Sequence, residues 1–253
     1  MIEQPLKNRI ALVTGATRGI GHAIALGLAE AGAHVIALGR TQGALENLDD
    51  EIFAATGQHA TLVPIDLRQP ETVDPLGGVI YERWGKLDIL IGAAGVLGAL
   101  TPVPHLDPKA WDHIMTVNLT ANWRLIRSMD ALLRASDAGR AIFLSSGVAQ
   151  NWRAFWGGYA ASKAGLEALV GAYDDEMENT TVRAISVNPG AMRTRMRAGA
   201  FPGEDPMTLP APEEIVPLMV ELARPDRNPP RGKVISFREW KAAGGRLPET
   251  LAS

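Results

Sequence analysis

Cysteine is absent from this 253-residue sequence. Without it the chain has no disulfide, no thiolate ligand for zinc and no cysteine nucleophile. The five histidines are scattered, without the close spacing of a metal cluster, so we expect no bound metal. No arm or stripe of lysine and arginine is present and the net charge is −3, so we expect no nucleic-acid partner.

Long apolar runs are also missing. The most apolar stretch, residues 23–38, is interrupted by Glu30, Gly32 and His34 and is not expected to cross a bilayer. The first residues, MIEQPLKNR, contain no apolar signal core. We therefore expect a cytoplasmic protein with no membrane partner. Its length suits a single α/β domain spanning residues 1–253 with a well-buried core.

The first apolar run, residues 9–14, leads into a glycine-rich turn, GATRGIG, and then into an Ala- and Leu-rich helix. Glycines let a ligand approach the backbone, and the free N–H groups at the start of a helix attract anions. A second strand at residues 34–38 completes a β-α-β unit of the length that dinucleotide folds use. A tight bend alone would also use glycine, but the flanking strand and helix favour a phosphate site.

The residues after the second strand bear on the choice of dinucleotide. An acidic residue normally stands there to bind the ribose 2′-hydroxyl of NAD. This chain has Gly39-Arg40-Thr41 instead. Arg40, with Arg18 of the glycine turn, would suit a 2′-phosphate through charge-assisted hydrogen bonds. We therefore predict NADP(H) in preference to NAD(H), the alternative being two solvated surface arginines.

Strands and helices alternate along the chain, with strands expected at residues 9–14, 34–38, 60–65, 87–91, 141–144, 181–187 and 233–237. This alternation predicts a single-domain, Rossmann-type, doubly wound parallel sheet of about seven strands with helices on both faces. Small and polar residues follow the strands at Asp66, 92–95, Ser146 and 188–190. Because the carboxyl ends of parallel strands lie at one edge, these residues would line one rim of the sheet.

Two longer segments stand out. Residues 108–135 have the apolar period of one long helix, and Asn118 lies inside it, where asparagine is a poor helix former. Residues 191–212 lose all regular period, and we expect them to form a substrate-lid loop. The long helices at 108–135 and 157–178 are candidates for a symmetric interface, so we expect a homo-oligomer, a tetramer or a dimer.

A hydroxyl, a phenol and an ammonium occur together in residues 143–169. Tyr159 and Lys163 are four residues apart in a helical segment and would share one face. Ser146 lies thirteen residues before the tyrosine, at the end of a strand. These groups are the parts for proton transfer to a carbonyl oxygen. The Tyr/Lys pair alone is more often an exposed helical pair, so the case depends on the other motifs.

Together these motifs resemble the short-chain dehydrogenase/reductase family over residues 7–237, and within it bacterial 3-oxoacyl-(acyl-carrier-protein) reductase-like oxidoreductases. The carrying residues are TGATRGIG at 14–21, Asp66-Leu67, Asn118, the run from Ser146 to Tyr159-Ala-Ala-Ser-Lys163, and PGAMRT at 189–194. The resemblance implies hydride transfer between a nicotinamide and a small-molecule carbonyl or secondary alcohol. A non-catalytic dinucleotide-sensing regulator on the same fold is the alternative, although such a protein would be expected to lose the Tyr or the Lys.

The resemblance also implies roles for the matching residues. Tyr159 would be the general acid/base, and Lys163 would lower its pKa and hold the nicotinamide ribose. Ser146 would donate a hydrogen bond to the substrate oxygen, and Asn118 would anchor a water of a proton relay. The implied cofactor-binding residues are Gly15, Thr17, Arg18, Gly19, Ile20, Gly21, Arg40, Asp66, Leu67, Ala93, Ala94, Gly95, Asn118, Tyr159, Lys163, Pro189, Gly190 and Thr194.

Two segments depart from the family pattern. Residues 92–95 are Gly-Ala-Ala-Gly where the family usually has Asn-Asn-Ala-Gly, so side-chain hydrogen bonds near the cofactor are lost. Residues 235–238 are Ile-Ser-Phe-Arg in place of Val-Asp-Gly-Gly, which puts the subunit packing usually built there in question.

Aromatic and sulfur-containing residues gather near the tyrosine. If Trp152, Phe155 and Trp156 face the cleft with Met192 and Met196 of the lid, the substrate is apolar or has a flat ring. If they face a neighbouring helix or subunit, they are packing or interface anchors. The sequence favours neither arrangement.

Four arginines, Arg153, Arg193, Arg195 and Arg197, lie near the predicted mouth of the cleft. They would meet an anionic end of the substrate or remain solvated, and solvation is the expected state.

Overall fold

Seven parallel strands form one sheet in the order β3-β2-β1-β4-β5-β6-β7. The computed structural model describes residues 4–247. The strands are β1 (Ile10–Thr14), β2 (His34–Gly39), β3 (Thr61–Pro64), β4 (Ile89–Gly92), β5 (Arg140–Leu144), β6 (Arg183–Asn188) and β7 (Val234–Ser236). Strand β1 pairs with both β2 and β4, so the order of the strands reverses there. The predicted fold class is confirmed, and a ligand cleft is expected at this reversal.

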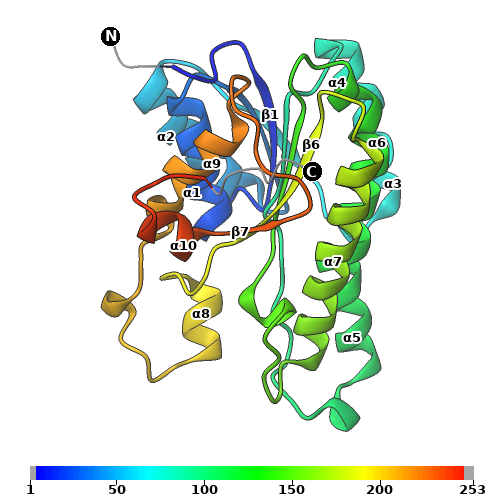
Figure 1. Cartoon of the computed structure of the whole chain (residues 1–253), viewed down its shortest axis with the longest axis vertical. Coiled ribbons are helices and arrows are strands. Elements are labelled where there is room, and N and C mark those ends of the chain that lie inside the picture. The colour runs from blue at the N-terminus through cyan, green and yellow to red at the C-terminus, as the bar shows by residue number, and fades with distance from the viewer. Residues whose placement is uncertain (1–3, 248–253) are drawn as a thin grey trace.

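Helices cover both faces of the sheet (Figure 1). One face carries α1 (Gly19–Glu30), α2 (Gln42–Thr56), α9 (Val216–Ala223) and α10 (Phe237–Ala242). The other carries α3 (Pro70–Val73), α4 (Leu76–Trp84), α5 (Pro108–Met115), α6 (Ala121–Arg134) and α7 (Gly157–Glu176). Helix α8 (Arg195–Ala200) lies beyond the end of the sheet in Figure 1. None of the helices between residues 4 and 247 is long and apolar enough to cross a membrane.

The strands are apolar on both sides because both sides of the sheet are packed. In β1, Ala11 and Val13 belong to the core beneath α1 and α9, and Leu12 belongs to the core beneath α4, α6 and α7. Phe143 of β5, which has no exposed surface, packs into the second core. Two hydrophobic cores, separated by the sheet, therefore fix the positions of its carboxyl ends.

The predicted helix over residues 108–135 is present, and it runs without a break from residue 108 to residue 134, but its geometry is not uniform. A π-helical turn, Thr116–Thr120, separates α5 from α6. Asn118 lies inside this turn, with its side chain bonded to atoms outside the helix. A π turn widens the helix locally and often marks a functional segment. Asn118, the poor helix former in the apolar pattern, thus lies where the helix changes from α to π geometry.

The segment at residues 191–212 is more regular than the sequence predicts. It contains α8 and a 3₁₀ turn, Pro206–Thr208. The Thr194 hydroxyl caps α8 by accepting a hydrogen bond of 3.2 Å from the Arg197 N–H. With only six residues, α8 is too short to produce a readable helical period, which is why the pattern appeared irregular.

Candidate active site

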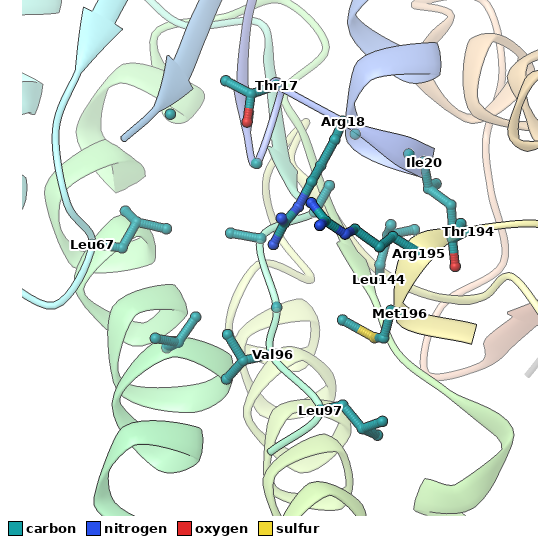
Figure 2. Close-up of a pocket in the computed structure, with 18 of the residues that line it drawn as sticks. Thr17, Arg18, Ile20, Leu67, Val96, Leu97, Leu144, Thr194, Arg195 and Met196 are labelled. Carbon is teal, nitrogen blue, oxygen red and sulfur yellow. The ribbon is translucent and has the colours of Figure 1, made fainter. Parts of the chain in front are cut away.

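A cavity of about 560 Å³ opens at the carboxyl ends of the strands beside the reversal point. Figure 2 shows it between the start of α1, the segment after β4 and α8. The predicted cofactor-binding residues that line it are Gly15, Thr17, Arg18, Gly19, Ile20, Gly21, Arg40, Asp66, Leu67, Ala93, Ala94, Gly95, Tyr159, Lys163, Pro189 and Thr194. Asn118 and Gly190 are not among its lining residues.

The glycine turn is packed too closely for larger residues. Gly15 has a φ of +66°, and a Cβ on it would lie 2.8 Å from the Cα of Ala94. A Cβ on Gly21 would lie 2.3 Å from the Gly15 carbonyl oxygen. A Cβ on Gly19, by contrast, would have the Thr194 Cγ2 as its nearest neighbour, at 3.5 Å. The turn is therefore tied to the segment after β4 and open at the start of α1, where a phosphate would bind.

The segment after β4 is held by other residues than the asparagine that is usual in the family. The Thr14 hydroxyl donates to the Ile91 carbonyl at 3.1 Å and accepts from the N–H groups of Ala93 and Ala94 at 3.1 and 3.2 Å. A Cβ on Gly92 would lie 2.3 Å from the Phe143 ring. A hydroxyl from β1 and a buried ring thus hold residues 92–95 in place.

Three arginines, Arg18, Arg40 and Arg195, line the cavity. Within residues 4–247 none of them forms a salt bridge. Asp66 already accepts hydrogen bonds from the backbone and guanidinium of Arg68, at 3.0 Å from the backbone N–H. These bonds, and to a smaller extent the charge of Arg40, hold the pKa of Asp66 below its usual range. The cavity therefore carries uncompensated positive charge.

Tyr159 and Lys163 lie on α7 and face the end of β5. The Lys163 Nζ donates to the Leu144 carbonyl at 2.7 Å and lies 5.9 Å from the centre of the Tyr159 ring. Burial raises the pKa of Tyr159, and a hydrogen bond with the Ser146 side chain opposes this rise. Burial lowers the pKa of Lys163 to about 8, and the charge of Glu167 opposes this fall. Tyr159 and Lys163 thus line the cavity, and Ser146 is bonded to Tyr159, although Ser145 and not Ser146 is among the lining residues.

Asn118 ties the active-site segments together. Its Oδ1 accepts from the Val96 N–H at 2.8 Å, and its Nδ2 donates to the Val96 carbonyl at 2.9 Å and to the Ser162 hydroxyl at 3.0 Å. The Asn118 carbonyl accepts from the Asn122 Nδ2 at 2.8 Å. Both its side-chain amide and its main-chain carbonyl are therefore engaged within the protein, and its part in a proton relay stays a prediction.

Glu167 was missed by the sequence analysis. It lies one turn after Lys163 on α7 and accepts hydrogen bonds from the Ser145 hydroxyl and, at 3.1 Å, from the Gln150 Nε2. The Ser145 hydroxyl is therefore engaged with Glu167, while Ser146 is the serine bonded to Tyr159. The i, i+4 spacing of Lys163 and Glu167 was the available signal.

Of the four residues considered for contact with the substrate, Met196 and Trp156 lie at or near the cavity, and Trp152 and Met192 do not line it. Trp156 lies with its ring centre 6.0 Å from that of Tyr159 and 5.8 Å from that of Phe201, and Met196 lines the cavity (Figure 2). Trp152 is 85% exposed. Met192 is 2% exposed and packs in the core beneath α1. The expectation that Met192 faces the cleft is therefore incorrect, because its side chain fills the hydrophobic core.

Comparisons with known proteins agree with this geometry. The family model for short chain dehydrogenases matches residues 9–205. The uncharacterized oxidoreductase YciK of Escherichia coli (strain K12) is 37% identical over 241 residues, covering 94% of this chain and 95% of that protein. The 3-oxoacyl-(acyl-carrier-protein) reductase FabG of Vibrio cholerae is 30% identical over 229 residues, covering 87% and 92%.

A solved structure is also similar. It is a short chain dehydrogenase from Shigella flexneri complexed with NADP, and it superposes with a TM-score of 0.88 at 36% identity, covering 93% of this chain and 99% of that one. The region that the family model matches, residues 9–205, includes the glycine turn, the Tyr/Lys helix and most of the segment at 191–212. The chain therefore belongs to the short-chain dehydrogenase family of oxidoreductases.

Proposed function

We propose that the protein is an NADP(H)-dependent oxidoreductase that interconverts a carbonyl and a secondary alcohol, with Tyr159 as the general acid/base. The observation that carries the proposal is that Tyr159, bonded to Ser146, and Lys163 line a cavity that also contains a glycine turn and three arginines without a salt bridge in residues 4–247. The NADP bound by the Shigella flexneri neighbour supports the choice of cofactor.

The residues of the cavity fit such a cofactor. The open backbone at Gly19 and the start of α1 would hold the diphosphate, and Arg18 and Arg40 would hold the 2′-phosphate. The small side chains of residues 93–95 leave room for a flat ring, and the Lys163 ammonium would hold the nicotinamide ribose. When bound, the nicotinamide supplies or accepts the hydride.

The protein's own groups then manage the proton and the developing charge. A phenol whose pKa is raised by burial keeps its proton at neutral pH, so Tyr159 is suited to donate that proton to a carbonyl oxygen. The Ser146 hydroxyl would donate a hydrogen bond to the same oxygen as negative charge forms there. The Lys163 ammonium would stabilise the phenolate that remains on Tyr159.

The substrate is expected to be apolar beside its carbonyl. Met196 lines the cavity, and the Trp156 ring lies next to the Tyr159 ring, so apolar groups form part of the phenol's surroundings. We further propose that residues 191–212 act as the substrate lid, because α8 brings Met196 to the cavity and Phe201 to Trp156.

A screen of NADPH oxidation with 3-oxoacyl thioesters, ketones, quinones and sugar-type carbonyls would identify a working substrate. With that substrate, Tyr159→Phe is expected to lower turnover by several orders of magnitude while NADPH affinity stays nearly unchanged. Tyr173→Phe is the matched control, because Tyr173 lies on the same helix but its hydroxyl donates to Asp130 at 2.8 Å, outside the cavity. Equal turnover in wild type and Tyr159→Phe would reject the assignment. A wild type that binds NADPH but reduces no carbonyl would favour the dinucleotide-sensing alternative.

A further inference from the structure

Arg195, the first residue of α8, extends into the cofactor cavity. Figure 2 shows its side chain and that of Arg18 reaching toward each other from α8 and from the glycine turn. Neither guanidinium forms a salt bridge with an acidic side chain in the described part of the chain. Two like charges directed into one space repel each other unless an anion lies between them. The two guanidinium groups therefore face a part of the cavity that suits the anionic groups of a ligand.

The other arginines near α8 have partners elsewhere. Arg197 pairs with both carboxylate oxygens of Glu204, at 2.5 and 2.6 Å, and Arg193 contacts the sulfur of Met207 at 3.0 Å. Arg153 lies over the Phe201 ring, 5.1 Å from its centre. Of these four arginines, Arg195 is the one that lines the cavity.

The position of Arg195 indicates which part of a dinucleotide it would meet. Its neighbour Thr194 lies against the glycine turn, since a Cβ on Gly19 would be 3.5 Å from the Thr194 Cγ2. Gly19 begins α1, and the start of that helix is where a dinucleotide fold binds the diphosphate. We propose that Arg195 clamps the cofactor diphosphate, beside Arg18 with its contact to the 2′-phosphate, and that the Arg195 contact holds α8 against the cavity. The proposal rests on the proposed function, because it requires a bound dinucleotide.

This contact would link cofactor binding to the substrate side of the site. Helix α8 continues into Phe201, whose ring lies 5.8 Å from that of Trp156, and Trp156 lies 6.0 Å from Tyr159. The Arg197–Glu204 pair fixes the end of α8 to the following loop. Holding α8 by its first residue therefore holds Phe201 and the aromatic wall beside the phenol. The cofactor, rather than the substrate, is the ligand that positions the lid.

Arg195→Gln tests the clamp, with Arg193→Gln as the matched control from the same segment. We expect Arg195→Gln to raise the dissociation constants of NADPH and NADH by the same factor, roughly tenfold for the loss of an exposed charge-assisted contact, because both nucleotides carry the diphosphate. Arg193→Gln should leave both constants unchanged. A loss confined to NADPH would place Arg195 at the 2′-phosphate and overturn the diphosphate assignment. Unchanged binding of both nucleotides would overturn the clamp altogether.

Hydrogen exchange tests the effect on the lid. With NADPH at the same saturation for every variant, residues 195–201 should become protected in the wild type and in Arg193→Gln but much less in Arg195→Gln. Equal protection in all three would overturn the link between cofactor and lid. Failure of the proposed function is distinguishable, because it would appear as a wild type that binds neither nucleotide or as a Tyr159→Phe variant with full turnover.

Discussion

Placing a methyl group at Gly92 should destabilise the fold through the Phe143 ring. In Gly92→Ala the new Cβ would lie 2.3 Å from the Phe143 Cδ1 and 2.7 Å from the Asn122 Oδ1. Carbon atoms in contact lie about 3.5–4.0 Å apart, so the ring must move by more than 1 Å. Phe143 has no exposed surface, so its ring can move only by disturbing the core between β4, α6 and α7.

The expected cost can be estimated from two opposing effects. Overpacking a core with one extra methyl group costs about 1–3 kcal/mol. Replacing glycine in a strand by alanine returns roughly 0.5–1 kcal/mol, since the alanine chain has less conformational freedom to lose, and Gly92 does not have a positive φ that alanine would resist. The net loss in the free energy of unfolding should therefore lie between about 0 and 2.5 kcal/mol, with a central value of about 1 kcal/mol.

A double-mutant cycle with Phe143→Leu measures the clash directly. The smaller side chain leaves room for the methyl group, so Gly92→Ala should cost about 1 kcal/mol less in the Phe143→Leu background than in the wild type. Urea unfolding followed by circular dichroism, at one protein concentration and without nucleotide, gives the four stabilities. Equal costs in the two backgrounds would show that a clash with the Phe143 ring is not the reason why Gly92→Ala destabilises the fold.

Two further predictions concern the cavity. Arg40→Asp should shift the preference from NADPH toward NADH, and an unchanged ratio of the two kcat/KM values would show that Arg40 does not contact the 2′-phosphate. Burial lowers the pKa of Lys163 to about 8, and the proposed mechanism needs its ammonium form, so kcat/KM for reduction should be full below pH 8 and fall as the pH rises through it. Glu167→Gln removes the charge that raises this pKa, so the fall should move to lower pH; an unmoved profile would exclude Glu167 from tuning Lys163.

The sheet and most of the cavity were predictable because they follow from local pattern. Short apolar runs marked all seven strands, and the parallel order then brought Asp66 and residues 93–95 to one edge. The homo-oligomer and the catalytic roles remain predictions.

Side-chain direction was not predictable in the same way. Met192 and Met196 are four residues apart, yet one fills the core and the other lines the cavity. The difference follows from where α8 begins, and a six-residue helix after an irregular turn leaves no period to read. The contact between Ser145 and Glu167 was hidden for a similar reason, because it joins two elements whose relative placement only the folded chain determines.

Asn118 has a consequence beyond the site it supports. Its amide bonds both the N–H and the carbonyl of Val96, as a residue of a neighbouring strand would. A side chain from a helix thus takes the place of one rung of a β-ladder, four residues past the end of β4 at Gly92. Asparagine and glutamine are the side chains that combine a carbonyl and an NH₂ group in this way. Asparagine is the shorter of the two, so it fixes a closer approach of the helix to Val96. At this position an aspartate, though equal in size, would turn one half of the rung into a repulsion between two oxygens.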